Sequence, residues 1–290
     1  MSFKDTLFSN NHTINCSGTI MDLTRPKIMG ILNVTPDSFY DGGRSFTEKD
    51  IHQKVSEMVQ EGVDILDVGG YSSRPGAADI SSEEEKERLK KGIQIIRNEF
   101  PDLPLSVDTF RSEIAEYAVK EFGACIINDI SAGRSDDRMF QVVSTHHVTY
   151  LMMHMQGNPR IMQVNPQYGD VTREVIAFFA ERIAVAREAG IKDIIIDPGF
   201  GFGKTVNHNY TLLRELGLFE MLDCPVAIGI SRKSMVYKPL GMTPDDALTG
   251  TVALHALALL NGAVILRVHD VKEAVQTVKL VDLYLYGYDN

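Results

Sequence analysis

The chain has 290 residues, of which 44% are hydrophobic and 23% charged, a composition typical of a folded globular protein with a sizeable core. Its formal charge of -10 and its pI near 5.3 exclude a general attraction to nucleic acid or to an anionic membrane, so neither is expected as a partner. An anionic substrate would need a local pocket of basic side chains and backbone N–H groups.

The cysteines and the N-terminal residues bear on the compartment. Cys16, Cys125 and Cys224 are odd in number and widely spaced, so they predict neither a disulfide framework nor a zinc site. The first residues lack the apolar core of a signal peptide, and the longest apolar stretch, 252–268, is broken by polar residues. We therefore expect a cytoplasmic protein.

Two kinds of strand pattern follow one another along the chain. Residues 1–26 alternate polar and apolar side chains around Gly18 and predict a hairpin that plugs the bottom of the next domain. From residue 27 onward short apolar, β-branched runs recur, at 27–34, 64–70, 104–109, 125–131, 149–155, 193–199, 225–231 and 263–270. Near-continuous apolar runs are typical of parallel strands covered on both faces.

Amphipathic helical patterns separate these runs. Ile51, Val55 and Met58 share one helix face, and Gly62 follows as a C-terminal cap; the same arrangement recurs before Gly123. Longer patterns cover 171–189, 245–260 and 271–285. Eight strands alternating with helices predict one α/β domain over 27–290, a closed (β/α)8 TIM barrel, in preference to an open doubly wound sheet.

Polar side chains gather at or just after the C-terminal ends of the predicted strands. In this fold, active sites are built from those ends. The set comprises Asn33, Asp67, Asp108, Asn128, Asp129, His154, Asp197, Ser231, Arg232, Lys233, Arg267, His269 and Asp270. Some of these groups would only cap loops, an alternative as good as the functional one for Asp67, Asp129 and Asp270. Asp108, Asp197 and Lys233 are the stronger candidates.

The segment 198–205, PGFGFGKT, approaches a nucleotide P-loop, but Pro198 stands where that motif begins with glycine. Proline removes a backbone donor and fixes φ, so it is a poor start for a phosphate-binding loop. The glycines more plausibly let backbone approach a flat ligand, with Phe200 or Phe202 to stack on it.

Motifs at the strand ends resemble those of the dihydropteroate synthases, in order and from about residue 27 to the end of the chain. They are ILNVTPDSFYDGG (31–43), GGYSSRPGA (69–77), VDT (107–109), IINDIS (126–131), LMMHMQGNP (151–159), DPGFGFGK (197–204), GISRKS (229–234) and LRVHDV (266–271). The resemblance implies that 4-aminobenzoate displaces diphosphate from a (7,8-dihydropterin-6-yl)methyl diphosphate to give 7,8-dihydropteroate in folate biosynthesis.

The resemblance also assigns residues to each part of the substrates. Pterin binding falls to Asp108, Asn128, Met153, Asp197, Gly201, Phe202 and Lys233, and catalysis to Asp108, Lys233, Ser73 and Arg74. An ionised Asp108 would stabilise the positive charge that develops on the pterin if the C–O bond breaks before the amine attacks. Asp197 would accept a fork of N–H groups from the pyrimidine edge.

For the diphosphate, the matching residues are Asn33, Ser73, Arg74, Arg267 and His269, with Asn33 also expected to contact Mg2+. For 4-aminobenzoate they are Pro75, Phe202, Ser231 and Lys233. The loops 35–47 and 71–78 are expected to act as lids over bound substrate. One departure stands out: many family members have glutamate where this chain has Tyr71.

Two alternatives remain for the function. A related pterin-binding methyltransferase would hold the same ring, but it would have no use for a diphosphate grip beside the SRK segment 231–233. A catalytically silent pterin-binding protein would be signalled by loss of Asn33, Arg74, Lys233 or Arg267, and all four are present. The resemblance further implies a homodimer formed through the last barrel helices, around 242–260.

Overall fold

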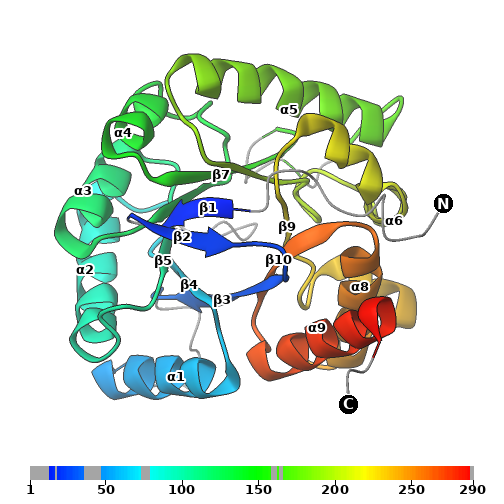
Figure 1. Cartoon of the computed structure of the whole chain (residues 1–290), viewed down its shortest axis with the longest axis horizontal. Coiled ribbons are helices and arrows are strands. Elements are labelled where there is room, and N and C mark those ends of the chain that lie inside the picture. Colours follow the sequence, from blue (N-terminus) through cyan, green and yellow to red (C-terminus); the bar gives the residue numbers. More distant parts are fainter. Residues whose placement is uncertain are drawn as a thin grey trace.

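The computed structural model describes residues 13–16, 18–35, 47–72, 79–157, 162 and 166–287, which form a barrel of strands inside a ring of helices (Figure 1). The strands are β1 (Thr13–Cys16), β2 (Thr19–Asp22), β3 (Lys27–Asn33), β4 (Ile65–Gly69), β5 (Leu105–Asp108), β6 (Ile126–Asp129), β7 (Thr149–Met153), β8 (Ile194–Asp197), β9 (Val226–Ile228) and β10 (Ala263–Val268). The helices are α1 (Glu48–Glu61), α2 (Ser82–Glu99), α3 (Ser112–Phe122), α4 (Met139–His146), α5 (Val171–Glu188), α6 (Val206–Arg214), α7 (Ser234–Tyr237), α8 (Leu248–Leu260) and α9 (Val271–Tyr286), with 3-10 turns η3 (Leu216–Leu222) and η4 (Lys238–Leu240).

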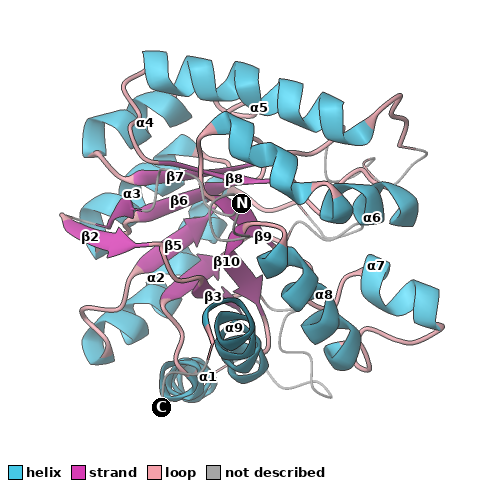
Figure 2. Ribbon diagram, turned by 45° about the vertical axis from the view of Figure 1, so that its right-hand side comes forward, coloured by secondary structure: helices cyan, strands magenta, loops and turns pink. Residues whose placement is uncertain are grey.

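Within the described residues, eight parallel strands close in the order β10-β3-β4-β5-β6-β7-β8-β9, which confirms the predicted (β/α)8 barrel. Strands β3 and β10 close the ring, with Lys27 opposite Ile265 and Gly30 opposite Val268. Helices surround the strands on the outside, so each strand is buried on both faces (Figure 2). This double burial explains why the strands read as apolar runs in the sequence.

Strand β7 shows how the barrel interior is divided into layers. Leu151 and Met153 point inward because they are alternate residues, whereas Met152 packs outward against the helices. Leu151 belongs to a lower apolar layer and Met153 to an upper one. The strand ends that carry polar groups therefore lie above a filled barrel core.

The predicted N-terminal hairpin is present, and its buried side chains pack on the lower interior layer of the barrel. Strands β1 and β2 pair antiparallel, with Cys16 opposite Thr19. Buried Ile14, Cys16 and Leu23 pack in one cluster with the lower interior layer, and Cys16 Sγ lies 3.0 Å from Cys125 Sγ at the start of β6. Figure 1 shows the hairpin lying across the middle of the ring of helices.

Glycines end the first helices as expected from the sequence. Gly62 and Gly123 adopt left-handed φ values of 97° and 64°, and their N–H groups bond back to the last turns of α1 and α3. None of the helices in the described part of the chain combines the length and apolar character that a membrane crossing requires.

Candidate active site

The upper rim of the barrel brings together charged and polar residues that lie in or just after five strands. Asp108 ends β5, Asn128 lies in β6, Asp197 ends β8 and Arg267 lies near the end of β10. Lys233 follows β9 in the loop before α7. The structure therefore gathers the main pterin-binding candidates of the sequence at one end of the fold.

Arg267 is the centre of an ion-pair cluster on this rim. Its Nε donates to Asp67 Oδ2 at 2.6 Å, and its Nη2 donates to Asp108 Oδ2 at 2.7 Å. Ser106 Oγ and Asn128 Nδ2 also donate to Asp67, which is fully buried. Burial alone would lower the pKa of Arg267, but Asp67 and Asp108 outweigh it and raise that pKa above its ordinary value. Asp67 therefore orients Arg267.

Opposing effects act on the pKa of Asp108 within this cluster. Burial raises the pKa of Asp108 to about 7, the nearby Arg267 opposes that rise, and the charges of Asp67, Glu85 and Asp129 add to it. The side chain keeps one fifth of its surface exposed, so it is accessible to a ligand in the rim. A carboxylate held in this way gains from any positive charge that arrives beside it.

Lys233 and Asp197 form a second charged group beside this cluster. A Cβ built on Gly229 would lie 3.7 Å from Lys233 Nζ, 3.9 Å from Arg267 Cβ and 4.0 Å from Asp197 Oδ2. Burial lowers the pKa of Lys233 to about 8, with Asp197 opposing the change. Burial raises the pKa of Asp197, with Lys233 opposing it. Gly229 thus leaves a space bordered by both signs of charge.

An apolar wall completes the pocket. Its buried side chains lie between β6, β7 and the loop after β7, with Phe110 and Phe202 packed against them; they are Ile130, Met153, Met155 and Met162. The Lys233 ammonium lies 4.5 Å from the centre of the Phe202 ring. Phe202 is therefore placed to contact a flat ligand, whereas Phe200 is fully buried in the main core and is unsuited to stacking.

The glycine-rich loop after β8 is held together by Lys204, a residue that the sequence patterns do not single out. Lys204 is 3% exposed, and its Nζ donates to the carbonyl oxygens of Gly199 and Phe202 at 3.0 and 3.1 Å. It also lies 2.9 Å from His154 Nδ1, and burial lowers the pKa of Lys204 to about 7 and that of His154 to about 2. Gly199, with φ 72°, packs so closely that a Cβ would fall 1.9 Å from His154 O.

Other strand-end polar groups serve the structure. Asp129 accepts from Tyr150 Oη at 2.6 Å and from two backbone N–H groups, so it caps the loop after β6. Asp270 binds Arg232 through two hydrogen bonds of 2.9 and 2.7 Å. His154 contacts Lys204 at the glycine-rich loop after β8. The loop-capping alternative therefore describes Asp129, whereas Asp67 and Asp270 each pair with the side chain of an arginine.

Several of the remaining predicted site residues also lie on the upper rim. Ser231 is buried and accepts from His269 N at 3.3 Å, so the predicted 4-aminobenzoate and diphosphate residues after β9 and β10 lie side by side. A Cβ on Gly69 would lie 3.2 Å from Asn33 Oδ1 and 3.6 Å from Asp108 Cβ, which places Asn33 on the same rim. Gly201, φ 81°, lies against the Lys233 stem.

Ser73, Arg74, Pro75 and most of both expected lids, 35–47 and 71–78, lie outside the described residues.

Tyr71 takes part in an aromatic and cationic contact instead of supplying a carboxylate. Its ring meets Phe110 edge-on at 5.1 Å, and the Arg111 guanidinium lies 5.5 Å from its centre. Its hydroxyl donates to Asp79 Oδ1 at 3.4 Å. Tyr71, which replaces the glutamate of many family members, therefore packs against the residues that follow β5.

Comparisons with known proteins agree with this arrangement. Residues 29–269 match the family model described as "Pterin binding enzyme". The chain is 43% identical to the dihydropteroate synthase of Escherichia coli over 275 residues, 94% of this chain and 96% of that protein. Its fold superposes on the Yersinia pestis enzyme, solved with a sulfonamide drug, with a TM-score of 0.88 at 38% identity, covering 94% of this chain and 98% of that one.

A third relative has been solved with molecules of the expected reaction. The Xanthomonas albilineans dihydropteroate synthase with 4-aminobenzoic acid is 40% identical, has a TM-score of 0.87, and is matched over 95% of this chain and 98% of that chain. The same enzyme has been solved with 7,8-dihydropteroate, at a TM-score of 0.84 and 38% identity, over 94% of this chain and 99% of that one.

Proposed function

The chain belongs to the pterin-binding enzymes and, among them, to the dihydropteroate synthases, and from that premise we propose how its upper rim performs the reaction. It is a transferase of folate synthesis, which condenses (7,8-dihydropterin-6-yl)methyl diphosphate with 4-aminobenzoate to 7,8-dihydropteroate and diphosphate. The observation that supports the mechanism most is that two carboxylates, Asp108 and Asp197, lie on the rim next to two cations, Lys233 and Arg267.

The first step is cleavage of the C–O bond between the pterin methylene carbon and the diphosphate. The bonding electrons leave with the diphosphate, and positive charge spreads over the pterin ring. Asp197 accepts N–H groups from the pyrimidine edge, Asn128 meets the adjacent edge, and ionised Asp108 lies near the ring. Because burial disfavours the charge of Asp108 in the free enzyme, the developing cation is stabilised more than the ground state.

The leaving diphosphate is bound by basic side chains at and just after the end of β10. Arg267 and His269 grip its oxygens; a guanidinium has five N–H donors, so bonds to two carboxylates do not exhaust it. The amide oxygen of Asn33, which lies on this rim, would hold Mg2+, because a hard cation needs few protein ligands when a diphosphate supplies the others. Bound there, Mg2+ would neutralise diphosphate charge.

In the second step the aniline nitrogen of 4-aminobenzoate forms the C–N bond to the methylene carbon and releases a proton. An aniline is neutral at pH 7, so this step needs no strong general base. Phe202 and the Lys233 stem contact the aromatic ring, and Ser231 with nearby backbone binds the carboxylate. Gly201 lets the Lys233 stem lie close to the loop, which fixes that wall.

The test is diphosphate release from the pterin diphosphate with Mg2+, measured with and without 4-aminobenzoate on the wild type. Turnover that requires 4-aminobenzoate and yields 7,8-dihydropteroate supports the mechanism's overall reaction. Tight pterin binding without diphosphate release would instead favour the silent binding protein. Removing Mg2+ with a chelator is expected to weaken binding of the pterin diphosphate more than binding of the bare pterin.

We also propose that the protein is a homodimer in the cytoplasm. Exposed apolar side chains gather on the neighbouring helices α8 and α9: Leu257 is 48% exposed, Leu280 67% and Tyr284 77%. A second copy covering this face would remove them from water. Light scattering should then show twice the chain mass, and Leu280→Glu should give monomers. In the described residues all cysteines are thiols, which suits a reducing compartment.

A further inference from the structure

A buried carboxylate outside the substrate pocket braces the strand end that carries Asp108. Glu85 lies in the first turn of α2 and is fully buried. Buried carboxylates are costly unless their oxygens are paired, and both of these are. Oε1 accepts from Thr109 Oγ1 at 2.8 Å, and Oε2 accepts from Arg111 Nη1.

These two partners define the turn that follows Asp108. Thr109 Oγ1 also accepts from Arg111 N at 3.2 Å, and Thr109 N donates to Asn128 O at 3.0 Å. Thr109 is thus held by α2 on one side and by β6 on the other. The conformation of the backbone directly after Asp108 is fixed by these bonds, and that backbone sets the direction of the Asp108 side chain.

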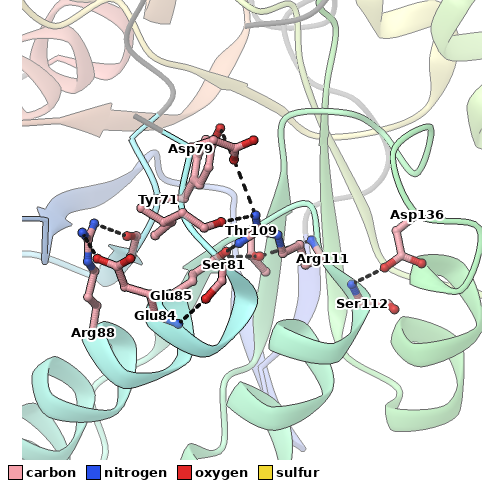
Figure 3. A network of polar contacts seen from close by, with 12 residues as sticks. Tyr71, Asp79, Ser81, Glu84, Glu85, Arg88, Thr109, Arg111, Ser112 and Asp136 are labelled. Carbon is pink, nitrogen blue, oxygen red and sulfur yellow. Dashed lines mark hydrogen bonds and ion pairs between the residues drawn. The ribbon is translucent and has the colours of Figure 1, made fainter. Parts of the chain in front are cut away.

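The neighbouring strand end is fixed by the same residue. A Cβ on Gly70 would lie 3.0 Å from Glu85 O and 3.2 Å from Glu85 Cγ, so the chain after β4 packs directly on Glu85. Arg111, bound to Glu85, also donates to Ile80 O at 2.7 Å and lies 5.5 Å from the Tyr71 ring. Figure 3 shows Tyr71, Glu85, Thr109 and Arg111 lying close together.

We propose that Glu85 is a positioning residue for the reaction: through Thr109 and Arg111 it holds Asp108 in the orientation that faces the pterin cation. The proposal rests on the proposed function of Asp108. Glu85 itself touches no substrate. Its negative charge adds a second effect, because it is among the charges that raise the pKa of Asp108, together with Asp67 of β4 and Asp129 of β6. Arg267 of β10 opposes them, and Lys233 lies nearby.

The decisive pair of variants changes one hydroxyl. Thr109→Val removes the donor to Glu85 with little change in volume, and we expect kcat to fall by about tenfold to a hundredfold, with KM for the pterin diphosphate within about twofold. Thr109→Ser keeps the hydroxyl and should restore most of kcat. If Thr109→Val retains the wild-type kcat and only lowers Tm, Glu85 and Thr109 are structural and the proposal is wrong.

The second readout is the pH profile of kcat/KM for Glu85→Gln, beside Glu84→Gln. Glu84 is the adjacent, exposed residue, and its partner is Arg88. Removing the Glu85 charge lowers the pKa of Asp108, so Asp108 ionises earlier and the acid limb shifts to lower pH. The Glu84 variant should leave the limb in place. An unmoved limb in Glu85→Gln contradicts the proposal.

Failure of this proposal is separable from failure of the function. If the wild type releases no diphosphate, the proposed function fails. If the wild type is active while the Thr109 and Glu85 variants match it in kcat and in pH profile, only the positioning role fails. Should Glu85→Gln not fold, the Thr109 pair decides the matter.

Discussion

The two ends of the barrel use the same eight strands but opposite kinds of side chain. At the lower end, buried apolar residues of the hairpin such as Ile14 and Leu23 pack on the interior layer. At the upper end, Asp108 and Lys233 are held with pKa values displaced toward about 7 and about 8 by burial. The lower end gains free energy from packing, whereas the upper end retains an electrostatic cost.

This difference separates stability from catalysis within one domain. A carboxylate or an ammonium kept away from water disfavours the folded state but is ready to stabilise charge in a substrate. The apolar lower end offsets that cost. Substitutions at the upper end should therefore change mainly the kinetic constants, and substitutions at the lower end mainly the free energy of unfolding.

The largest effect is expected for Lys233→Ala. The ammonium is 4.5 Å from the Phe202 ring and beside Asp197, so its loss should lower kcat/KM by about a hundredfold to a thousandfold. The free energy of unfolding should fall by no more than about 3 kcal/mol, because removal of a cation that burial disfavours partly offsets the lost hydrogen bond to Phe200 O and the lost charge beside Asp197. Steady-state kinetics and denaturant unfolding measure both quantities. Lys238→Ala, an exposed lysine in η4, is the control and should change neither.

The next effect belongs to the hairpin. Ile14 in β1 is 2% exposed, and Ile14→Ala should lower the free energy of unfolding by about 2–5 kcal/mol while kcat stays unchanged. Ile20 in β2 is 73% exposed, so Ile20→Ala should cost less than about 0.5 kcal/mol. A fall in kcat for folded Ile14→Ala would show that the two ends are coupled.

A smaller effect is expected at Asp129, a strand-end carboxylate with structural contacts. Tyr150→Phe deletes the hydroxyl that donates to it at 2.6 Å, and should cost about 1–3 kcal/mol of unfolding free energy. Tyr284→Phe, at an exposed tyrosine of α9, is the matched control. Because Asp129 has no assigned contact with substrate, kcat should be unaffected; a large loss of kcat would return Asp129 to the catalytic group.

The fold was predictable because buried parallel strands leave continuous apolar runs. The predicted bounds extend too far at the upper end: the run 225–231 contains β9 only over Val226–Ile228. Residues 229–231 remain small or apolar although they form the pocket loop, so composition does not mark the end of the strand. The short helix α7 also lies ahead of the pattern expected from 245.

The site was predictable only in part. Asp108, Asp197, Lys233 and Arg267 were found because strand ends and motifs place them together. The bond between Glu85 and Thr109 spans 24 positions and joins a helix to a strand end, so no periodic pattern reveals it. Asp67 and Arg267 are 200 positions apart in the sequence. Lys204 lies in a loop whose sequence draws attention to its glycines, and its hydrogen bond to Gly199 O is not apparent from that pattern. These contacts arise from tertiary packing.

The most direct test is titration of the Asp108 carboxyl carbon by 13C NMR in the unliganded protein, with the signal assigned by its loss in Asp108→Asn. We predict a pKa near 7 for Asp108, well above that of an ordinary aspartate, because burial outweighs the pairing with Arg267. A pKa near or below about 4 would mean that the ion pair fully compensates for burial. The upper rim would then carry no electrostatic cost at Asp108, and the contrast between the two ends of the barrel would fail.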